Sequence, residues 1–111
     1  MEMTESQQDG TTIVEPRGRI DTNSAKPFGE RLAVLIAGGA HQLVIDLQQI
    51  PYISSAGFRA LLIAAKMMDE AKGKLVLCGM SAEIKRLFEI GAFTDLFIIC
   101  GTRDEGVTKT K

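Results

Sequence analysis

Short apolar runs alternate with longer segments of helical periodicity, and this alternation constrains the fold more than any other feature of the sequence. The runs at 43–47 and 74–78 have the length of strands that are covered on both faces. In the segments at 24–37, 55–72 and 81–90, apolar residues recur at the spacing of one helical face. Strands that alternate with helices imply βαβ crossovers, so the pattern predicts a mainly parallel sheet with packed helices.

A hairpin is expected at the start of the chain. A turn signal at 8–10 separates a weak strand at 3–7 from a strand at 11–16. This hairpin would add an antiparallel pair at one side, so the sheet should be mixed. A last strand is expected at 97–100, and the polar end of the chain, 102–111, is expected to be frayed.

The helices have recognisable start and stop signals. Ser24 is expected to cap the first helix, with Pro27 in its first turn and Gly38 at its end. Ser81 is expected to cap the last helix, which Gly91 ends. The residues expected to face the core from the three helices are Phe28, Leu32, Leu35 and Ile36, then Phe58, Leu61, Leu62, Ala65 and Met68, then Ile84, Leu87 and Phe88.

The composition is that of an ordinary globular protein, with 45% hydrophobic and 24% charged residues. A chain of 111 residues has the size of one domain, which we predict over 1–101 with a polar C-terminal tail at 102–111. The formal net charge of -1 comes without a basic patch, which argues against direct nucleic-acid binding. The N-terminus lacks an apolar signal region, and no stretch approaches the length of a membrane span, so a cytoplasmic protein without membrane insertion is expected.

Motifs of enzymes and metal sites are absent from the sequence. Cys78 and Cys100 have neither metal-ligand nor CxxC spacing and are expected to be buried, reduced thiols, although a disulfide between them stays open. His41 has no metal-ligand companions. Because GxSxG, GxxxxGK[ST] and GxGxxG are also missing, no catalytic residue, metal or cofactor is expected.

The segment at 50–58 carries the most information about function. It leaves the end of a central strand and opens a helix, and sites in open α/β sheets gather at that edge. Ser54 and Ser55 stand at the helix start, where the helix dipole and the free N–H groups of Ala56 and Gly57 favour negative charge. A phosphate on Ser55 would therefore be tolerated by the fold. The residues alone leave the alternative that either serine is only an N-cap.

Four blocks of the sequence occur in the order and spacing of a known family. They are Gly18-Arg19-Ile20-Asp21, Leu43-Val44-Ile45-Asp46-Leu47, Ile53-Ser54-Ser55-Ala56-Gly57-Phe58, and Lys85-Arg86-Leu87-Phe88 followed by Gly91. Together they resemble the STAS family of anti-sigma-factor antagonists, over roughly residues 10 to 100. The resemblance implies an α/β fold with a single STAS-like domain.

The resemblance also implies a regulatory switch. In that family a serine at the start of this helix is phosphorylated by a partner kinase that is also an anti-sigma factor or its relative, and a serine phosphatase resets it. The modified serine falls on Ser55, and Gly57 matches the glycine of the family motif. Ser54 stands where Asp is common, which supplies a second hydroxyl and leaves modification of Ser54 open. Asp21 is implied to lie near the phosphosite, although a simple capping aspartate would look the same.

A phosphate on Ser55 would act through its charge. Phosphoserine carries about -1.5 to -2 charges at pH 7. A partner packed over this edge would meet a desolvation cost and, beside Asp21, like-charge repulsion. We therefore expect the unmodified protein to bind its kinase partner and the modified protein to release it.

The outer face of the helix at 55–72 is expected to contribute to docking. This face carries Arg59, Ile63, Lys66 and Met67. Apolar residues one turn apart on a face that should be wet, next to the phosphosite, are typical of a docking surface. Isolated surface apolar residues are the alternative, since these are common in monomeric proteins.

Two other classes of function stay open. One is a STAS-type adaptor subunit of a membrane transport or stress-signalling assembly, without reversible phosphorylation. The other is a small enzyme or nucleotide binder of flavodoxin-like shape. Incubation with a kinase and ATP tests the first alternative, and a ligand retained through purification tests the second.

Overall fold

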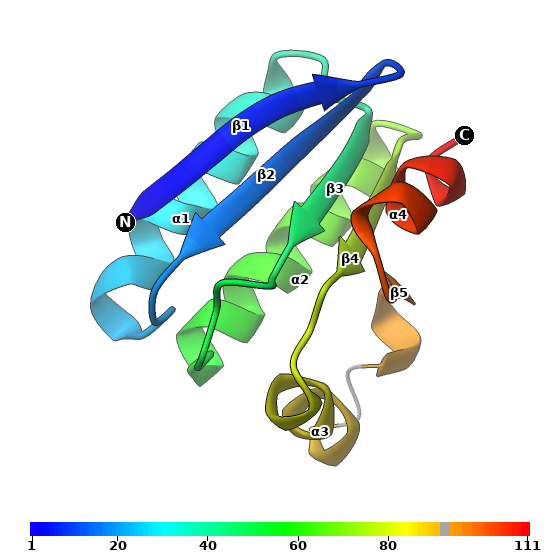
Figure 1. Ribbon diagram of the computed structural model, residues 1–111. Helices are drawn as coiled ribbons and strands as arrows, with labels where there is room; N and C mark the ends of the chain where they lie inside the picture. Colours follow the sequence, from blue (N-terminus) through cyan, green and yellow to red (C-terminus); the bar gives the residue numbers. More distant parts are fainter. Residues whose placement is uncertain (92–93) are drawn as a thin grey trace.

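The computed structural model describes residues 1–91 and 94–111 and shows a mixed sheet of five strands (Figure 1). The strands lie in the order in which they occur along the chain: β1 (Glu2–Gln8), β2 (Thr11–Arg17), β3 (Gln42–Asp46), β4 (Lys74–Cys78) and β5 (Ile98–Cys100). β1 is antiparallel to β2, whereas β2, β3, β4 and β5 are parallel to one another. The predicted mixed, mainly parallel sheet is therefore confirmed.

The hairpin between β1 and β2 closes through a two-residue turn. Gln8 pairs with Thr11, which leaves Asp9 and Gly10 as the turn residues. Both have positive φ angles, 52° and 82°. This combination is typical of a type I′ turn, whose twist matches that of the two strands. The turn signal in the sequence therefore predicted the hairpin correctly.

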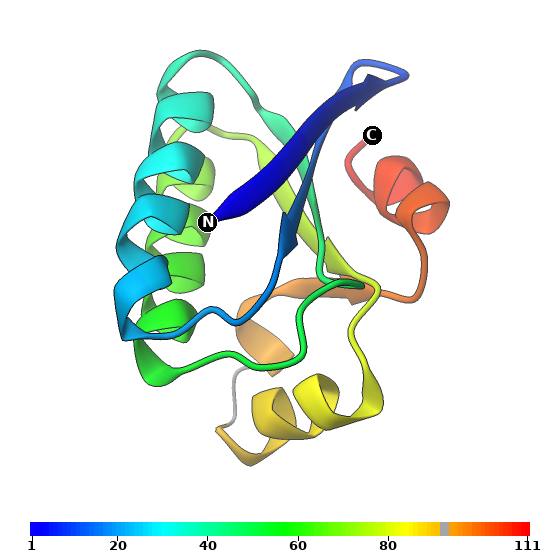
Figure 2. The same cartoon turned by 60° about the vertical axis from the view of Figure 1, so that its left-hand side comes forward.

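The helices cover the two faces of the sheet unequally. α1 (Thr22–Ala37) and α2 (Ser55–Glu70) pack against each other on one face, and α4 (Arg103–Lys109) lies on the other face over β3 and β4 (Figure 2). α3 (Ala82–Ile90) and the short 3-10 helix η1 (Thr94–Leu96) lie between β4 and β5 in the chain. Because α1 follows β2 and α2 follows β3, both helices begin at the same edge of the sheet.

Two apolar clusters fill the space between these layers. The larger cluster lies between the sheet and the pair α1 and α2, and its fully buried side chains include Phe28, Leu32, Leu43, Ile45 and Leu61. The smaller cluster includes Ile13, Val44, Val76, Cys78 and Val107. Consecutive residues of β3 thus enter opposite clusters. This explains why its apolar run is continuous, since both faces of the strand are covered.

The first helix begins earlier than its sequence signals suggest. Asp21, and not Ser24, is the N-cap of α1, and its carboxylate accepts hydrogen bonds from the backbone N–H groups of Asn23 and Ser24. The Ser24 hydroxyl in turn accepts the Asp21 N–H at 2.9 Å, which completes a capping box. Pro27 consequently lies inside the helix and not in its first turn. A carboxylate is the stronger cap at this position because its hydrogen bonds are charge-assisted.

The buried side of α2 also differs from the predicted stripe. Gly57 and Ala64 are buried, whereas Leu62 and Ala65 are only half-buried. Leu35 of α1 is likewise half-buried. Two contacts shape this side: Gly57 lies against Ile20 and Ile53 in the loops before α1 and α2, and Ala60 faces Gly29 of α1.

In α3, one of the expected core residues faces outward. Ile84 and Phe88 are buried, but Leu87 is 37% exposed. Phe88 makes edge-to-face contacts with Phe58 of α2 at 4.8 Å and with Phe97 at 5.6 Å, measured between ring centroids. α3 therefore packs through a narrow face of aromatic contacts, which leaves Leu87 outside it.

The end of the chain is a helix and not the frayed tail that its polarity suggests. α4 places Val107 in the smaller cluster, and Thr110 is also buried, with its hydroxyl 2.8 Å from that of Thr11. At the start of the helix, Arg103 pairs with the carboxylate of Asp46 at the end of β3. Specific contacts therefore hold a polar segment that has little apolar surface of its own.

Candidate functional site

The starts of α1 and α2 are joined by backbone hydrogen bonds at one edge of the sheet. Ile20, just before α1, forms a parallel bridge with Ile53, just before α2. The Ile20 N–H donates to the carbonyl of Tyr52 at 2.9 Å, and the Ser54 N–H donates to the carbonyl of Ile20 at 2.8 Å. Asp21, which follows Ile20, therefore lies at the same edge of the sheet as Ser54 and Ser55. This edge is where the strands of an open α/β sheet end and where ligand and modification sites gather.

The two neighbouring serines have different positions. Ser54 is the N-cap of α2, half-buried, and its hydroxyl accepts the Gly57 N–H at 3.3 Å. Ser55 is the first residue of the helix and is exposed. The capping alternative thus applies to Ser54. The Ser55 side chain stands in solvent at the positive end of the helix dipole.

Gly57 allows α2 to begin close to the bridge beneath it. An added Cβ would lie 2.8 Å from Cγ2 of Ile20 and 2.8 Å from Cγ2 of Ile53. Both isoleucines are buried and stiff at χ1, so they have little freedom to move aside. Gly57 therefore permits an approach of the backbone that a side chain would prevent.

Asp21 contributes a fixed negative charge to the site. The pKa of its carboxyl lies below the usual range, chiefly because the Ser24 backbone N–H donates to it. The Ser24 hydroxyl, the Asn23 N–H and the charge of Arg19 act in the same direction, and desolvation opposes them. Asp21 is thus both the cap of α1 and an anionic neighbour of the two serines.

One contact at this edge has no signal in the sequence. The Arg19 guanidinium lies over the ring of Tyr52, 4.3 Å from its centroid. Both residues are exposed, and they belong to the two loops that precede α1 and α2. This cation–π contact therefore joins the same loops that the backbone hydrogen bonds connect.

A shallow groove of about 370 Å³ runs between α1 and α2 next to the serines. Small residues form its floor, and an added Cβ on Gly29 of α1 would lie 3.3 Å from the Cβ of Ala60 of α2. Arg59 and Ile63 line it from α2, and Ile63 is 55% exposed. The groove begins at Ala56, the residue that follows Ser55. Two of the residues predicted for docking thus share one hollow beside Ser55.

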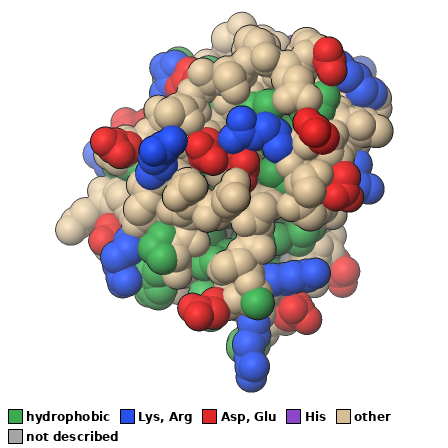
Figure 3. Space-filling model, viewed as in Figure 1, with side chains coloured by type: hydrophobic (Ala, Val, Ile, Leu, Met, Phe, Trp, Pro, Cys, Tyr) green, Lys and Arg blue, Asp and Glu red, His purple; other side chains and the backbone are tan. Residues whose placement is uncertain are grey.

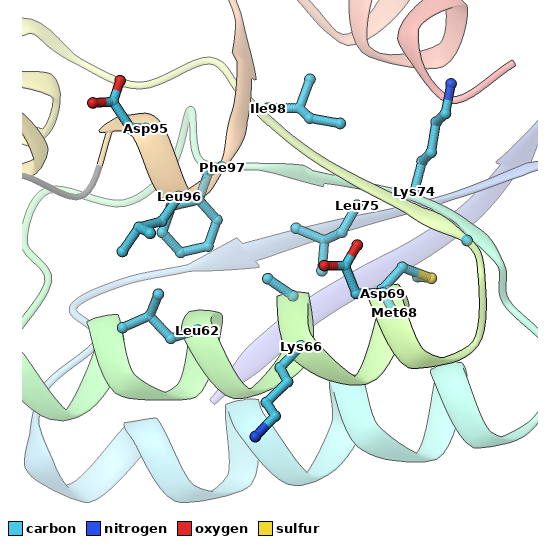
Figure 4. Close-up of a pocket in the computed structure, with 12 residues that line it drawn as sticks. Leu62, Lys66, Met68, Asp69, Lys74, Leu75, Asp95, Leu96, Phe97 and Ile98 are labelled. Atoms are coloured by element: carbon cyan, nitrogen blue, oxygen red, sulfur yellow. The ribbon is translucent and has the colours of Figure 1, made fainter.

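The other two predicted docking residues lie elsewhere. Lys66 is exposed but borders a separate hollow of about 530 Å³ between α2, the start of β4 and the segment 95–98. Figure 4 shows its side chain directed away from Leu75 and Phe97 on the far side of that hollow. Met67 is half-buried and packs against the larger core cluster, so its prediction as a wet, exposed residue is wrong. The cause is the position of α1, which packs against α2 and whose Ile36 and Ala37 border the same hollow as Met67.

The cysteines are free thiols in a weakly reactive environment. Cys78 is buried, and Cys100 is half-buried on the neighbouring strand. Burial raises the pKa of Cys78 to about 12, with the Asp46 charge adding to the effect, and burial also raises the pKa of Cys100. Both thiols are therefore protonated at neutral pH. The expected burial is confirmed for Cys78, whereas Cys100 is only half-buried.

The surface carries both signs of charge in close mixture. On the face shown in Figure 3, Lys and Arg side chains are interspersed with Asp and Glu side chains. Between residues 1 and 91 and between 94 and 111, no helix combines the length and apolar character needed to cross a membrane. The mixture of charges on this face agrees with the formal net charge of -1.

Comparisons with known proteins agree with this geometry. The family model of the STAS domain matches residues 2–106. A proposed anti-sigma factor antagonist, BtrV, of Bordetella bronchiseptica is 32% identical over 111 residues, which cover 100% of this chain and 96% of BtrV. The anti-sigma-B factor antagonist of Bacillus subtilis is 32% identical over 101 residues, which cover 91% of this chain and 92% of that protein.

Solved structures show the same fold at low sequence identity. A proposed anti-sigma factor antagonist from Thermotoga maritima superposes with a TM-score of 0.91 at 15% identity, covering 97% of this chain and 93% of that one. SpoIIAA of Bacillus in its phosphorylated form superposes with a TM-score of 0.74 at 13% identity, covering 99% of this chain and 100% of that one. The family model, the relatives and the fold lead to one conclusion: the chain belongs to the STAS domain family of anti-sigma factor antagonists.

Proposed function

We propose that this protein is a partner-switching antagonist whose state is set by phosphorylation of Ser55. In the unmodified state it binds a serine kinase that is also an anti-sigma factor, and so frees what that factor holds. Phosphorylation by the kinase ends the complex, and a serine phosphatase restores the unmodified state. The observation that carries the proposal is the exposed Ser55 hydroxyl at the first residue of α2, beside the Asp21 carboxylate and the groove between α1 and α2.

The choice of Ser55 over Ser54 rests on accessibility. A kinase must reach the hydroxyl oxygen, and Ser54 is a half-buried residue whose hydroxyl oxygen accepts the Gly57 N–H. Phosphorylation of Ser54 would first have to break the cap of α2. The Ser55 side chain is exposed and caps nothing in the described contacts.

The electrostatics of this edge support release after phosphorylation. The start of α2 tolerates an added dianion because its first N–H groups and its dipole favour negative charge. A partner surface seated on this edge has no such compensation. It would cover the phosphate at a large desolvation cost, next to an Asp21 carboxylate that is already ionised. The fold therefore stays intact while the complex loses affinity.

The groove between α1 and α2 supplies the docking surface in this proposal. Ile63 is an apolar side chain that is 55% exposed, and Arg59 lines the same groove. A partner that fills the groove would come within reach of Ser55, since the groove begins at Ala56. Lys66 lies about one turn beyond Ile63 on α2, outside the groove, and serves as a peripheral contact for the partner.

The relatives support the same class of function. The Bacillus subtilis relative is named an anti-sigma-B factor antagonist, and SpoIIAA, which shares the fold, is known in a phosphorylated form. By analogy, the partners of this protein are proteins, with no direct contact to nucleic acid and no insertion into a membrane. We place its action in the cytoplasm, where sigma factors work, and assign it no enzymatic activity.

A phosphate transfer assay tests the proposal. The purified protein is incubated with its kinase and ATP, and the intact mass is measured. We expect one added phosphate in the wild type and in Ser54→Ala, and none in Ser55→Ala. If the wild type gains no phosphate while it still binds the kinase, the protein is a passive adaptor subunit and the proposal is wrong.

A further inference from the structure

Ser55 and Arg59 lie four residues apart on α2, and both side chains are exposed. Residues at this spacing are neighbours on a helix surface, with Cβ atoms about 5 to 6 Å apart. A negative group that precedes a positive group by four residues has the more favourable of the two orders. We propose that phosphorylated Ser55 is bound by Arg59 of the same helix, and that this pairing withdraws the guanidinium from the docking groove.

Arg59 is available for such a pairing. Other arginines of this chain are already engaged, since Arg31 pairs with Glu5, and Arg103 pairs with Asp46. Across residues 1–91 and 94–111, the Arg59 side chain takes part in no ion pair. A phosphate on Ser55 would therefore meet an arginine that has no existing bond to break. The planar guanidinium suits phosphate because it can donate two parallel hydrogen bonds.

The pairing changes the groove as well as the phosphosite. In the unmodified protein, Arg59 lines the groove together with Ala56, Ala60 and Ile63. An Arg59 side chain that turns back toward residue 55 leaves this position. Phosphorylation then has two effects, because it adds a dianion at the edge and removes a cation from the docking surface. This inference rests on the proposed phosphorylation of Ser55 and assigns to Arg59 a role within that switch.

Arg19 is the rival counter-ion. Arg19 belongs to the loop before α1. This loop lies next to the start of α2, because the Ser54 N–H donates to the carbonyl of Ile20, the residue that follows Arg19. Its guanidinium, however, already lies over the Tyr52 ring at 4.3 Å. Binding a phosphate would cost this contact, whereas Arg59 has no cation–π contact to lose among the residues that the structure describes. The geometry therefore favours Arg59, and the two arginines can be separated by substitution.

The direct test is the titration of the phosphate itself. The full chain is produced with phosphoserine encoded at position 55, and the second pKa of the phosphate is followed by ³¹P NMR. A nearby guanidinium favours the dianion and lowers this pKa. We expect the pKa in Arg59→Gln to lie about 0.5 above that of the wild type, a factor of about three in the proton equilibrium. Arg59→Lys, which keeps the charge, should lie between them.

Two matched variants identify the source of any effect. Lys66→Gln removes an exposed cation from the same helix beyond reach of Ser55, and Arg19→Gln removes the rival. Both should leave the phosphate pKa within about 0.1 of the wild type. An unchanged pKa in Arg59→Gln overturns the inference, and a change confined to Arg19→Gln assigns the contact to Arg19 instead.

A second measurement links the pairing to release. The affinity of the kinase is measured for the phosphorylated and unmodified forms of the wild type and of Arg59→Gln. The factor by which phosphorylation lowers the affinity should be about threefold larger in the wild type than in Arg59→Gln. Only in the wild type does phosphorylation also remove a contact between Arg59 and the kinase. Equal factors in both backgrounds contradict the inference. Because the phosphoserine is encoded, this result is independent of whether the kinase itself modifies Ser55, so each proposal can fail alone.

Discussion

A Cβ atom on Gly57 would lie 2.8 Å from Cγ2 of Ile20, a distance shorter than real side-chain contacts allow. The start of α2 can therefore lie this close to the loop before α1 only because residue 57 has no side chain. This contact helps to position Ser55 relative to Asp21, because Ser55 lies two residues before Gly57 and Asp21 directly follows Ile20. It also makes the geometry of the site sensitive to a small substitution far from any charge.

Gly57→Ala should destabilise the protein by about 1 to 3 kcal/mol, since overpacking against two buried isoleucines outweighs the better helix propensity of alanine. Urea unfolding measures the change. Gly101→Ala is the control, because a Cβ there would meet only the flexible Glu105 carboxylate, at 3.3 Å. Equal stability of Gly57→Ala and the wild type would show that α2 can shift at no cost.

The two serines should differ in their effect on stability. Ser54→Ala removes the cap of α2 and should cost about 1 kcal/mol, whereas Ser55→Ala at the first helical position should change stability by less than about 0.5 kcal/mol. Thermal and urea unfolding of both variants provide the comparison. The reverse order would mean that Ser55 is the true cap and would weaken its assignment as the accessible hydroxyl.

The contact between Arg103 and Asp46 should hold α4 on the sheet. The Asp46 side chain is only 5% exposed, so Arg103→Met would leave a buried carboxylate unpaired. We expect a loss of about 2 to 3 kcal/mol, less than for a fully buried pair because Arg103 is 37% exposed. Faster hydrogen exchange of the α4 amides should accompany it. Arg86→Met, at an exposed arginine of α3, is the control and should leave both unchanged.

Ile63 should contribute to binding and not to folding. Because it is 55% exposed in the groove, Ile63→Asp should change stability by less than about 0.5 kcal/mol. The same variant should raise the Kd for the kinase about tenfold, by placing a charge in an apolar contact. Val34→Asp, at a residue that is 59% exposed toward the end of α1, is the matched control for binding. If Ile63→Asp and Val34→Asp bind the kinase with the same affinity, the groove is not part of the docking surface.

The sequence predicted those elements whose signals are local. The apolar run of β3, the hairpin turn at Asp9 and Gly10 and the cap of α3 by Ser81 all depend on neighbouring residues, and the structure confirms them. The position of Ser55 at the start of α2 was predictable for the same reason. The family resemblance implied that Asp21 lies near Ser55, which periodicity alone does not predict.

Features that depend on distant contacts could not be predicted. α4 has seven residues, and Val107 is its one large apolar side chain, so no periodic pattern reveals it; its position depends on contacts with β3 and β4. Met67 looked exposed because a helical wheel of α2 does not include α1, which covers it. The contact of Arg19 with Tyr52 requires two loops that are separated by more than thirty residues in the chain to meet.

The affinity of the purified kinase for two forms of this protein tests the central claim most directly. Isothermal titration calorimetry compares the unmodified chain with the chain that carries phosphoserine at position 55, and circular dichroism establishes that both are folded. The account predicts tight binding of the unmodified form and a loss of at least about a hundredfold for the phosphorylated form, with identical spectra. Equal affinities would contradict it.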